Sequence, residues 1–210
     1  MMLSAGAIQN LDRKFRLNLI NSITGVKPAN MIGTVSSDGE TNLAIISSVV
    51  HLGSDPALVG FVTRPTEEIP RHTYQNILDT TYFTINHVSA EYIKNAHYTS
   101  TKFPREISEF KECGFSEEYL DDFKAPFVKE SLIKIGVKYR QQIPIELNGT
   151  RLMIGEIQTI IFPDDAVNEK GYMDLEGFNN VGIGGLNQYY SLKKIGEFPY
   201  ARLGDEPDFD

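Results

Sequence analysis

The clearest hydrophobic pattern in the chain is alternation with a period of two, which is typical of half-buried strands. In residues 133–140, apolar side chains occupy every second position, and lysine, glycine or arginine occupies the others. Residues 143–147 continue the alternation, and Asn148-Gly149 then predicts a type I′ turn into a strand over residues 152–157. This part of the chain is therefore expected to form an antiparallel hairpin with one apolar and one solvated face.

The first part of the chain carries further strand patterns. Residues 31–35 and 42–46 are rich in β-branched and apolar residues, and Asp38-Gly39 between them predicts a hairpin turn. A third predicted strand, residues 58–63, lies between two breakers that contain proline. Residues 81–88 return to β-branched and aromatic side chains and predict a fourth strand.

Helical patterns are short and lie between the predicted strands. A helix is expected over residues 73–78, with Thr73 in the N-cap position. A second helical stretch is expected over residues 89–96, where a serine opens the segment. Two shorter helical pieces are expected around residues 107–110 and 117–123, in a polar and interrupted part of the chain.

The order of these elements predicts a mainly β fold. Six or seven strands arranged as hairpins favour a closed or split antiparallel β-barrel of Greek-key type over a parallel α/β sheet, with short helical insertions between barrel strands. We expect one domain over residues 1–203 and a loose acidic tail over residues 204–210.

Composition narrows the functional classes. The 210 residues carry a formal net charge of −8, which disfavours binding to a nucleic-acid backbone. No stretch approaches the roughly 20 apolar residues of a membrane helix, and residues 1–8 lack the pattern of a secretory signal. The single cysteine, Cys113, cannot form an internal disulfide and leaves no thiolate cluster for a metal. We therefore expect a cytoplasmic protein that binds neither nucleic acid nor membrane.

Familiar catalytic motifs are missing from the sequence. The four histidines are too far apart for a local metal motif, so no metal ligand is predicted. There is no Gly-x-Ser-x-Gly elbow, no phosphate loop and no Gly-x-Gly-x-x-Gly after a strand. The glycine-rich residues 182–185 lack the context of a phosphate loop and are interpreted as a flexible turn. No residue is predicted to be catalytic.

Small polar and basic side chains gather on or beside the predicted strands. Hydroxyl groups, guanidinium groups and the free amides of a first helical turn can together hold a phosphate dianion. The same residue types are common at strand ends and helix caps, and the residues alone favour that structural interpretation. The side chains concerned are Asn42, Ser47, Ser48, Arg64, Arg71, His72, Thr73 and Asn76.

An ordered series of motifs favours the ligand-binding interpretation of these residues over the structural one. The chain resembles the flavin reductase-like, FMN-binding split-barrel family from about Arg13 to Tyr190. The segments that carry the resemblance are Lys27 to Ser36, Asn42-x-Ala44-x-x-Ser47-Ser48, Asp55-Pro56, His72-Thr73-x-x-Asn76-Ile77, Ala96 to Phe110 and Gly155-Glu156-Ile157. Their order is more specific than any single motif. The resemblance implies an antiparallel split barrel that forms a homodimer, with FMN at or near the subunit interface.

The resemblance also implies a set of cofactor-binding residues. Residues of the 42–48 segment would border the flavin ring, and residues of the 64–76 segment would lie in the phosphate and ribityl region. The insertion that contains His97, Lys102 and Arg105 would reach over the ring. The implied cofactor-binding residues are Asn30, Asn42, Ala44, Ile46, Ser47, Ser48, Arg64, Arg71, Thr73, Asn76, His97 and Lys102.

The sequence departs from the family pattern at one position that matters for the electron donor. Members that use NAD(P)H usually carry an Asp-His pair where this chain has Gly149-Thr150. Two functions follow from the resemblance: an FMN-dependent oxidoreductase with a reduced donor such as NAD(P)H, or a flavoredoxin-like carrier that is reduced by a protein partner. FAD fits less well than FMN, and a barrel that has lost its flavin is a third alternative.

Overall fold

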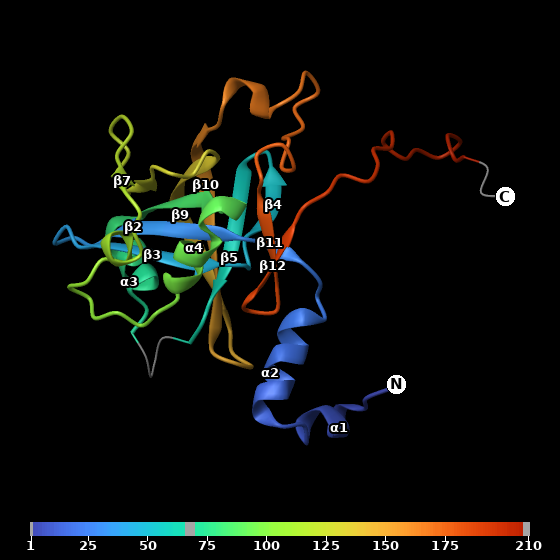
Figure 1. The fold of residues 1–210 in the computed structure, drawn as a ribbon, viewed down its shortest axis with the longest axis horizontal. Helices are drawn as coiled ribbons and strands as arrows, with labels where there is room; N and C mark the ends of the chain where they lie inside the picture. The colour runs from blue at the N-terminus through green and yellow to red at the C-terminus, as the bar shows by residue number, and fades with distance from the viewer. Residues whose placement is uncertain (1, 66–69, 208–210) are drawn as a thin grey trace.

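A seven-stranded antiparallel sheet forms the body of the protein (Figure 1). The structure is a computed structural model, and it describes residues 2–65 and 70–207. The strand order is β3-β2-β6-β9-β10-β5-β4, and each neighbouring pair is antiparallel. Its strands are β2 (Asn30–Val35), β3 (Thr41–Ile46), β4 (Val50–Ser54), β5 (Ala57–Thr63), β6 (Tyr82–His87), β9 (Lys134–Ile145) and β10 (Thr150–Ile161).

Short helices and two small sheets surround this body. A three-stranded sheet has the order β1-β11-β12, and β7 pairs with β8 in a two-stranded ribbon. The small strands are β1 (Lys27–Pro28), β7 (Glu117–Glu118), β8 (Phe127–Val128), β11 (Val181–Gly184) and β12 (Gln188–Ser191). The helices are α1 (Ala5–Gln9), α2 (Arg13–Ser22), α3 (His72–Thr80), η1 (Ala90–Tyr92), α4 (Ile93–Tyr98), α5 (Glu109–Glu112) and η2 (Asp164–Ala166).

Edge strands β3 and β4 follow one another in sequence, yet no pairing joins them among the described residues. The sheet therefore remains open along this line, as a split barrel requires. The predicted mainly β fold with antiparallel strands and short helical insertions is confirmed.

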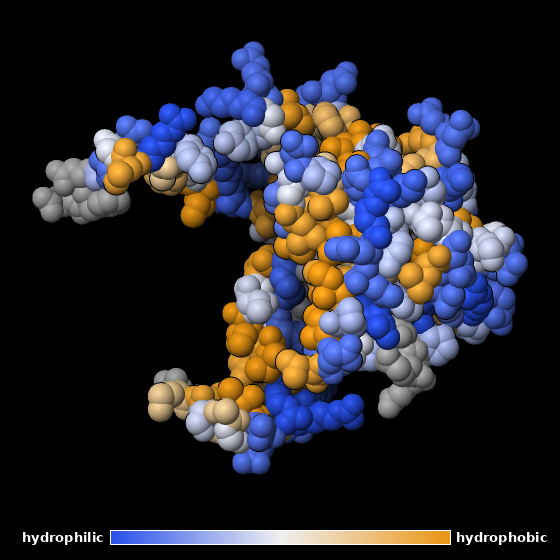
Figure 2. Space-filling view, turned by 180° about the vertical axis from the view of Figure 1, so that it is seen from behind, coloured by the Kyte–Doolittle hydropathy of each residue, from blue (hydrophilic) through white to orange (hydrophobic). Residues whose placement is uncertain are grey.

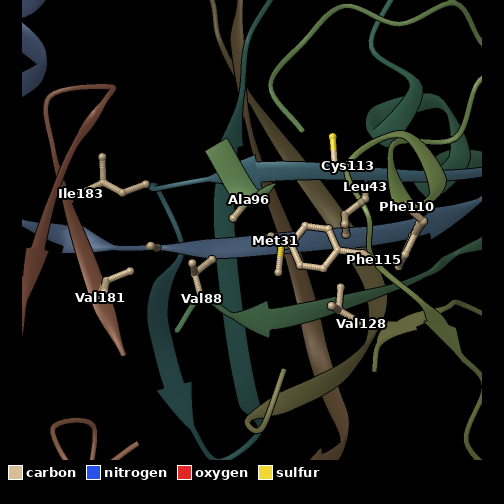
Figure 3. Close-up of a cluster of buried hydrophobic side chains, with 11 residues drawn as sticks. Met31, Leu43, Val88, Ala96, Phe110, Cys113, Phe115, Val128, Val181 and Ile183 are labelled. Carbon is tan, nitrogen blue, oxygen red and sulfur yellow. The ribbon is translucent and has the colours of Figure 1, made fainter. Parts of the chain in front are cut away.

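Two apolar clusters lie on opposite sides of β2. Met31 belongs to the cluster covered by α4 and α5, and Ile32 belongs to the cluster inside the barrel, because neighbouring side chains of a strand point to opposite faces. In the barrel cluster, the rings of Phe61 and Phe83 meet edge to face with centroids 5.6 Å apart. Figure 3 shows the first cluster, in which Phe110 and Phe115 of the insertion approach Met31 and neighbouring side chains of the sheet.

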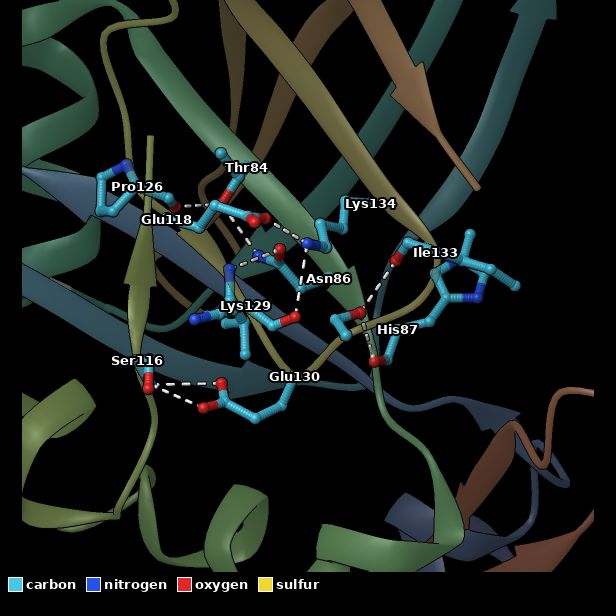
Figure 4. A network of polar contacts seen from close by, with 12 residues as sticks. Thr84, Asn86, His87, Ser116, Glu118, Pro126, Lys129, Glu130, Ile133 and Lys134 are labelled. Atoms are coloured by element: carbon cyan, nitrogen blue, oxygen red, sulfur yellow. Dashed lines mark hydrogen bonds and ion pairs between the residues drawn. The ribbon is translucent and has the colours of Figure 1, made fainter. Parts of the chain in front are cut away.

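A buried amide connects β6 to the segment that contains β8. Asn86 donates to the carbonyl of Met31 over 3.1 Å and to the hydroxyl of Thr84 over 2.9 Å, and it accepts from the amide of Val128 over 3.0 Å. Thr84 donates in turn to the carbonyl of Pro126 over 2.7 Å (Figure 4). These bonds hold the 126–128 segment on the outer side of the barrel.

Most predicted strands are present, with two differences of detail. The β2–β3 hairpin, β5 and β6 lie where the β-branched and aromatic runs and their flanking turn residues predict them, whereas β4 was not predicted. The predicted β9–β10 hairpin is also present, but its turn is not of type I′, since only Gly149 of the Asn148-Gly149 pair has a positive φ, +70°.

The helix predictions are partly wrong. The helical stretches after residue 89 and near residue 109 are confirmed, whereas residues 117–123 form no helix and contain β7. The N-cap of α3 is Arg71, so Thr73 lies inside the first turn. Gly182 and Gly184 belong to strand β11 and do not form a turn, because pairing with β1 and β12 fixes them on both sides.

Lys134 departs from the predicted solvated face of its strand. Its side chain is only 8% exposed, and its ammonium group forms an ion pair with Glu118 (Figure 4). The insertion before β9 covers this face, which the local alternation of the strand could not reveal.

Candidate functional site

Two elements that are distant in sequence meet at the candidate site. The side-chain amide of Asn42 on β3 donates to the hydroxyl of Thr73 on α3 over 2.9 Å. Because the hydroxyl of Thr73 is the acceptor, its own proton is available for another partner. The predicted residues of the 42–48 segment and of the 71–76 segment are therefore neighbours in space.

The outer edge of β3 is closed by side chains from the helical insertion. The amide of Leu43 donates to the carboxylate of Glu109 over 3.0 Å, and the amide of Ile45 donates to the hydroxyl of Thr99 over 2.9 Å. Burial raises the pKa of Glu109, because a desolvated carboxylate is disfavoured. These bonds hold the edge of β3 in place. The side chains of Leu43 and Ile45 lie on one face of this strand, and those of Asn42, Ala44 and Ile46 lie on the opposite face.

The N-terminus of α3 is open toward a ligand. Arg71 occupies the N-cap position and makes no side-chain hydrogen bond to the helix. The first amides of a helix have no acceptor within the helix, so those of the first turn, which contains His72 and Thr73, can donate to an anion. This helix has nine residues, and its N-terminus carries the positive end of the helix dipole.

Positive charge gathers at the same helix end. Burial lowers the pKa of Arg71, and the nearby charge of Arg64 lowers it further. Burial also lowers the pKa of His72, and Arg105 lowers it further, while Glu106 partly opposes this change. Among the described residues, no acidic side chain forms an ion pair with Arg64, Arg71 or Arg105. Such a group of like charges suits an anionic ligand, which would relieve their repulsion.

Asn76, one turn further along α3, has an unused acceptor. Its side chain is 2% exposed and donates to the hydroxyl of Thr34 over 3.2 Å, whereas its Oδ1 atom has no hydrogen-bond partner in the described structure. A buried acceptor without a donor is costly, so Asn76 suits a ligand that brings hydroxyl groups. The cationic helix end and this acceptor together fit the phosphate and the ribityl chain of a flavin nucleotide.

The two predicted serines differ in their contacts. Ser48 accepts from the amide of Val62 over 3.0 Å and donates to its carbonyl over 3.2 Å, so its hydroxyl connects the β3–β4 loop to β5. Ser47 is half-buried beside it. Asn30 is buried on β2, where it pairs with Ile46 of β3.

The insertion residues are not all brought to the helix end. Nδ1 of His97 lies 3.1 Å from the hydroxyl of Tyr189 on β12, and burial raises the pKa of this tyrosine to about 12. Among the described residues, neither side chain of this pair forms a hydrogen bond or a ring contact with α3. Lys102 is exposed in the loop after α4, and Arg105 of the same loop reaches the surroundings of His72.

Sequence reasoning missed two partners of the site. Thr34 accepts from Asn76, and it lies opposite Asn42 in the β2–β3 register. The predicted turn at Asp38-Gly39 sets this register, so Thr34 could have been found by counting back from the turn. The contact of Tyr189 with His97 joins distant segments and has no local signal.

Two hollows of the described structure lie away from these residues. One, of about 520 Å³, is lined by Tyr82, Phe123, Thr159 and their neighbours, and another, of about 150 Å³, is lined by His87, Asn180 and their neighbours. The described residues contain no group of three potential metal ligands. In the same parts of the chain, no helix is long and apolar enough to cross a membrane.

Comparison with known proteins identifies relatives over most of the chain. The family model of the flavin reductase like domain matches residues 26–181. The crystal structure of a proposed flavin reductase with a split barrel domain from Shewanella frigidimarina is 44% identical, has a TM-score of 0.92, and is matched over 96% of this chain and 100% of that one.

Two solved structures share the fold at lower identity. Component B of nitrilotriacetate monooxygenase from Bacillus cereus is 19% identical, with a TM-score of 0.83 over 94% of this chain and 99% of that one. Flavoredoxin from Desulfovibrio vulgaris is 22% identical, with a TM-score of 0.70 over 98% of this chain and 99% of that one. Both show that the split-barrel architecture extends over nearly the whole chain.

Proposed function

Since the chain belongs to the flavin reductase-like family, we propose that it is an oxidoreductase that holds FMN between β3 and the N-terminus of α3. One observation carries this proposal: Arg64, Arg71 and Arg105 gather around a helix end whose first turn is joined to β3 by the Asn42–Thr73 hydrogen bond. A terminal phosphate dianion matches this charge better than the bridging pyrophosphate of FAD does.

Different residues are proposed to bind the phosphate, the ribityl chain and the ring of FMN. The guanidinium groups and the first-turn amides of α3 hold the phosphate, Thr73 donates its free hydroxyl proton, and Asn76 accepts from the ribityl chain. The β3 segment from Ala44 through Ser48, with Asn30 behind it, borders the ring, and Lys102 approaches from the insertion. His97, held by Tyr189, orients that insertion.

Bound FMN supplies the redox chemistry by accepting two electrons from a donor and passing them to an acceptor. The protein contributes position and electrostatics, so no side chain is proposed as a catalytic acid, base or nucleophile. NAD(P)H is the proposed donor. A buried single cysteine suits a reducing, cytoplasmic setting for this chemistry.

We further propose that the active form is a homodimer. Large apolar side chains are exposed at the edge of the sheet formed by β4 and its neighbour β5, among them Val50, Leu52 and Val62. Exposed patches of this kind mark interaction surfaces. The candidate residues line neither of the two hollows described above, which fits a flavin site that a second subunit completes.

A flavoredoxin-like carrier is the second candidate function. The position that holds an Asp-His pair in NAD(P)H-dependent members of the family is occupied by Gly149-Thr150, at the tip of the β9–β10 hairpin. This difference favours a donor that is not a nicotinamide nucleotide, such as a redox protein.

Anaerobic visible spectroscopy of the purified protein separates the two candidates. Flavin bands that bleach promptly with NADH or NADPH would support the oxidoreductase and identify its donor. Bands that persist with both nucleotides and bleach only with a reduced redox protein would favour the carrier. A colourless protein that also fails to bind added FMN would contradict both functions.

A further inference from the structure

The C-terminal arm, residues 192–207, carries a concentration of highly exposed apolar side chains. It forms no helix or strand and leads away from the barrel (Figure 1). Four of its large side chains are between 86% and 100% exposed, namely Ile195, Phe198, Tyr200 and Leu203. A soluble protein seldom leaves such a concentration of apolar surface in water, so the arm requires a covering partner.

The base of the arm is held to the body by polar contacts. The amide of Lys194 donates to the carboxylate of Glu176 over 2.9 Å. Within the arm, Glu197 lies 2.5 Å from the ammonium group of Lys194 and 3.5 Å from that of Lys170 in the body. These contacts direct the arm outward, so that its apolar side chains do not fold back on the barrel.

Helix α2 has the complementary properties. None of its residues is buried, and two large apolar side chains are exposed: Phe15 is 57% exposed and Ile23, at the C-cap, is 66% exposed. Its first turn carries the exposed bases Arg13 and Lys14. The far part of the arm carries the acidic pair Asp205-Glu206. The arm also carries the basic residues Lys193, Lys194 and Arg202, so only its far part is acidic. The helix therefore offers an apolar surface with basic side chains to an apolar arm whose far part carries this acidic pair.

The arm and α2 leave the body on the same side, one at each rim of a large hollow (Figures 1 and 2). Apolar surface lines much of this hollow (Figure 2). A second copy seated in the hollow and related by a two-fold axis perpendicular to the line from the arm to α2 would place its own α2 at the arm of the first copy. The two-fold symmetry would repeat this contact, since an isologous interface uses each surface twice.

We propose that the C-terminal arm of each copy packs on α2 of a second copy of this chain. This exchange rests on the homodimer described under Proposed function and adds a specific contact to it. Phe198, Tyr200 and Leu203 cover the exposed apolar side chains of α2, and Asp205-Glu206 lies near Arg13 and Lys14. The arms thereby hold the dimer, while the barrel edges form its centre.

Cysteine cross-linking tests the contact directly. Cys113 is buried, so engineered thiols report without interference from it. One chain carries Phe15→Cys and a differently tagged, co-expressed chain carries Leu203→Cys. Mild oxidation is expected to give a covalent pair that contains both tags. The matched control replaces Leu203→Cys with Tyr119→Cys, an exposed position next to β7 on the side opposite α2 (Figure 1), and it should give no such pair.

The other outcomes overturn the exchange in distinguishable ways. A dimer that binds FMN but gives no cross-link leaves the proposed function standing and contradicts the arm contact. A cross-link within one chain of a Phe15→Cys/Leu203→Cys double variant shows that the arm covers its own α2. A monomer that binds FMN contradicts both the exchange and the dimer, whereas failure to bind FMN is a separate failure of the proposed function.

A charge reversal provides a second test of the same contact. The Arg13→Glu/Lys14→Glu variant should raise the dimer dissociation constant roughly fivefold at low salt. Acidic residues in the first turn favour the helix itself, so unfolding of α2 would not explain this loss. Adding Asp205→Lys/Glu206→Lys should restore the affinity. A dissociation constant that stays the same in both variants would contradict the proposed pairing.

Discussion

The side-chain amide of Asn42 lies 2.9 Å from the hydroxyl of Thr73, and this hydrogen bond joins edge strand β3 to the first turn of α3. The contact brings the ring side and the phosphate side of the proposed flavin site into one rigid frame. Preorganisation of this kind lowers the cost of binding a ligand that spans both sides.

A double-mutant cycle on this pair should show coupling in FMN affinity. Asn42→Ala should weaken binding by about 1 kcal/mol, or roughly fivefold, because it removes one neutral hydrogen bond. Thr73→Val should weaken binding more, by about 2 kcal/mol, because it also removes the charge-assisted bond from the Thr73 hydroxyl to the phosphate. The double variant should lose less than the sum of the two single losses, with a coupling energy of at least about 0.5 kcal/mol. Additive losses in a calorimetric titration would show that the two side chains act independently.

His72 should contribute a part of FMN affinity that rises as the pH falls, and this part opposes the loss caused by protonation of the FMN phosphate near pH 6. Burial and Arg105 lower the pKa of this histidine in the free protein, and a phosphate dianion beside it would raise that pKa again. His72 therefore takes up protons on binding, and its part of the affinity increases with acidity below the pKa of the complex, until the pH reaches the lower pKa of the free protein. Titrations between pH 5 and pH 8 should show that the ratio of wild-type to His72→Gln affinity rises as the pH falls, because phosphate protonation affects both proteins alike. A constant ratio would remove His72 from the phosphate region.

A different histidine, His87, should make the free energy of unfolding decrease as the pH is lowered. Burial lowers its pKa, and its hydrogen bond of 3.0 Å with Asn180 only partly opposes this effect. Below about pH 6.5 the unfolded chain binds a proton that the folded protein resists, so the free energy of unfolding falls as the pH approaches the folded pKa. The loss is about 1.4 kcal/mol for each unit by which the pKa is lowered. Chemical denaturation of His87→Gln should lack this part of the pH dependence, and an unchanged profile would assign it to another group.

Asn86 should matter for the fold more than for the flavin. All of its polar atoms are used in bonds to Met31, Thr84 and Val128 in the buried network (Figure 4). Asn86→Ala leaves buried groups without partners and should lower the free energy of unfolding by about 2–4 kcal/mol. The exposed Asn18→Ala on α2 serves as the control and should change stability by less than about 0.5 kcal/mol. A loss below about 1 kcal/mol in Asn86→Ala would mean that water replaces its bonds.

The fold could be predicted where local patterns carry the information. Alternation located β9, because side chains of period two dictate which face of a strand is buried, and β-branched or aromatic runs between turn residues located β2, β3, β5 and β6. It failed for Lys134, whose burial depends on an ion pair with Glu118 from a distant segment. The cap of α3 was misplaced for a related reason: Thr73 is used in a tertiary hydrogen bond to Asn42, and not as a cap of its own helix.

The candidate site was less accessible to sequence reasoning than the fold. Residue type suggested Arg64, Arg71, Thr73 and Asn76 as anion-binding groups, and the structure brings them to one end of α3. Tyr189 was not suggested, since its contact with His97 spans separate elements. Side chains that act across elements acquire their roles only when the chain folds.

The most direct measurement compares the affinities of FMN and riboflavin for the purified protein by quenching of flavin fluorescence. Riboflavin lacks the phosphate that the cationic end of α3 is proposed to hold, so FMN should bind at least about tenfold more tightly. Arg71→Met should remove most of this preference while riboflavin affinity stays unchanged, and the exposed Arg202→Met should leave both affinities as they are. Equal affinities for FMN and riboflavin in the wild type, or no binding of either, would contradict the proposed phosphate site.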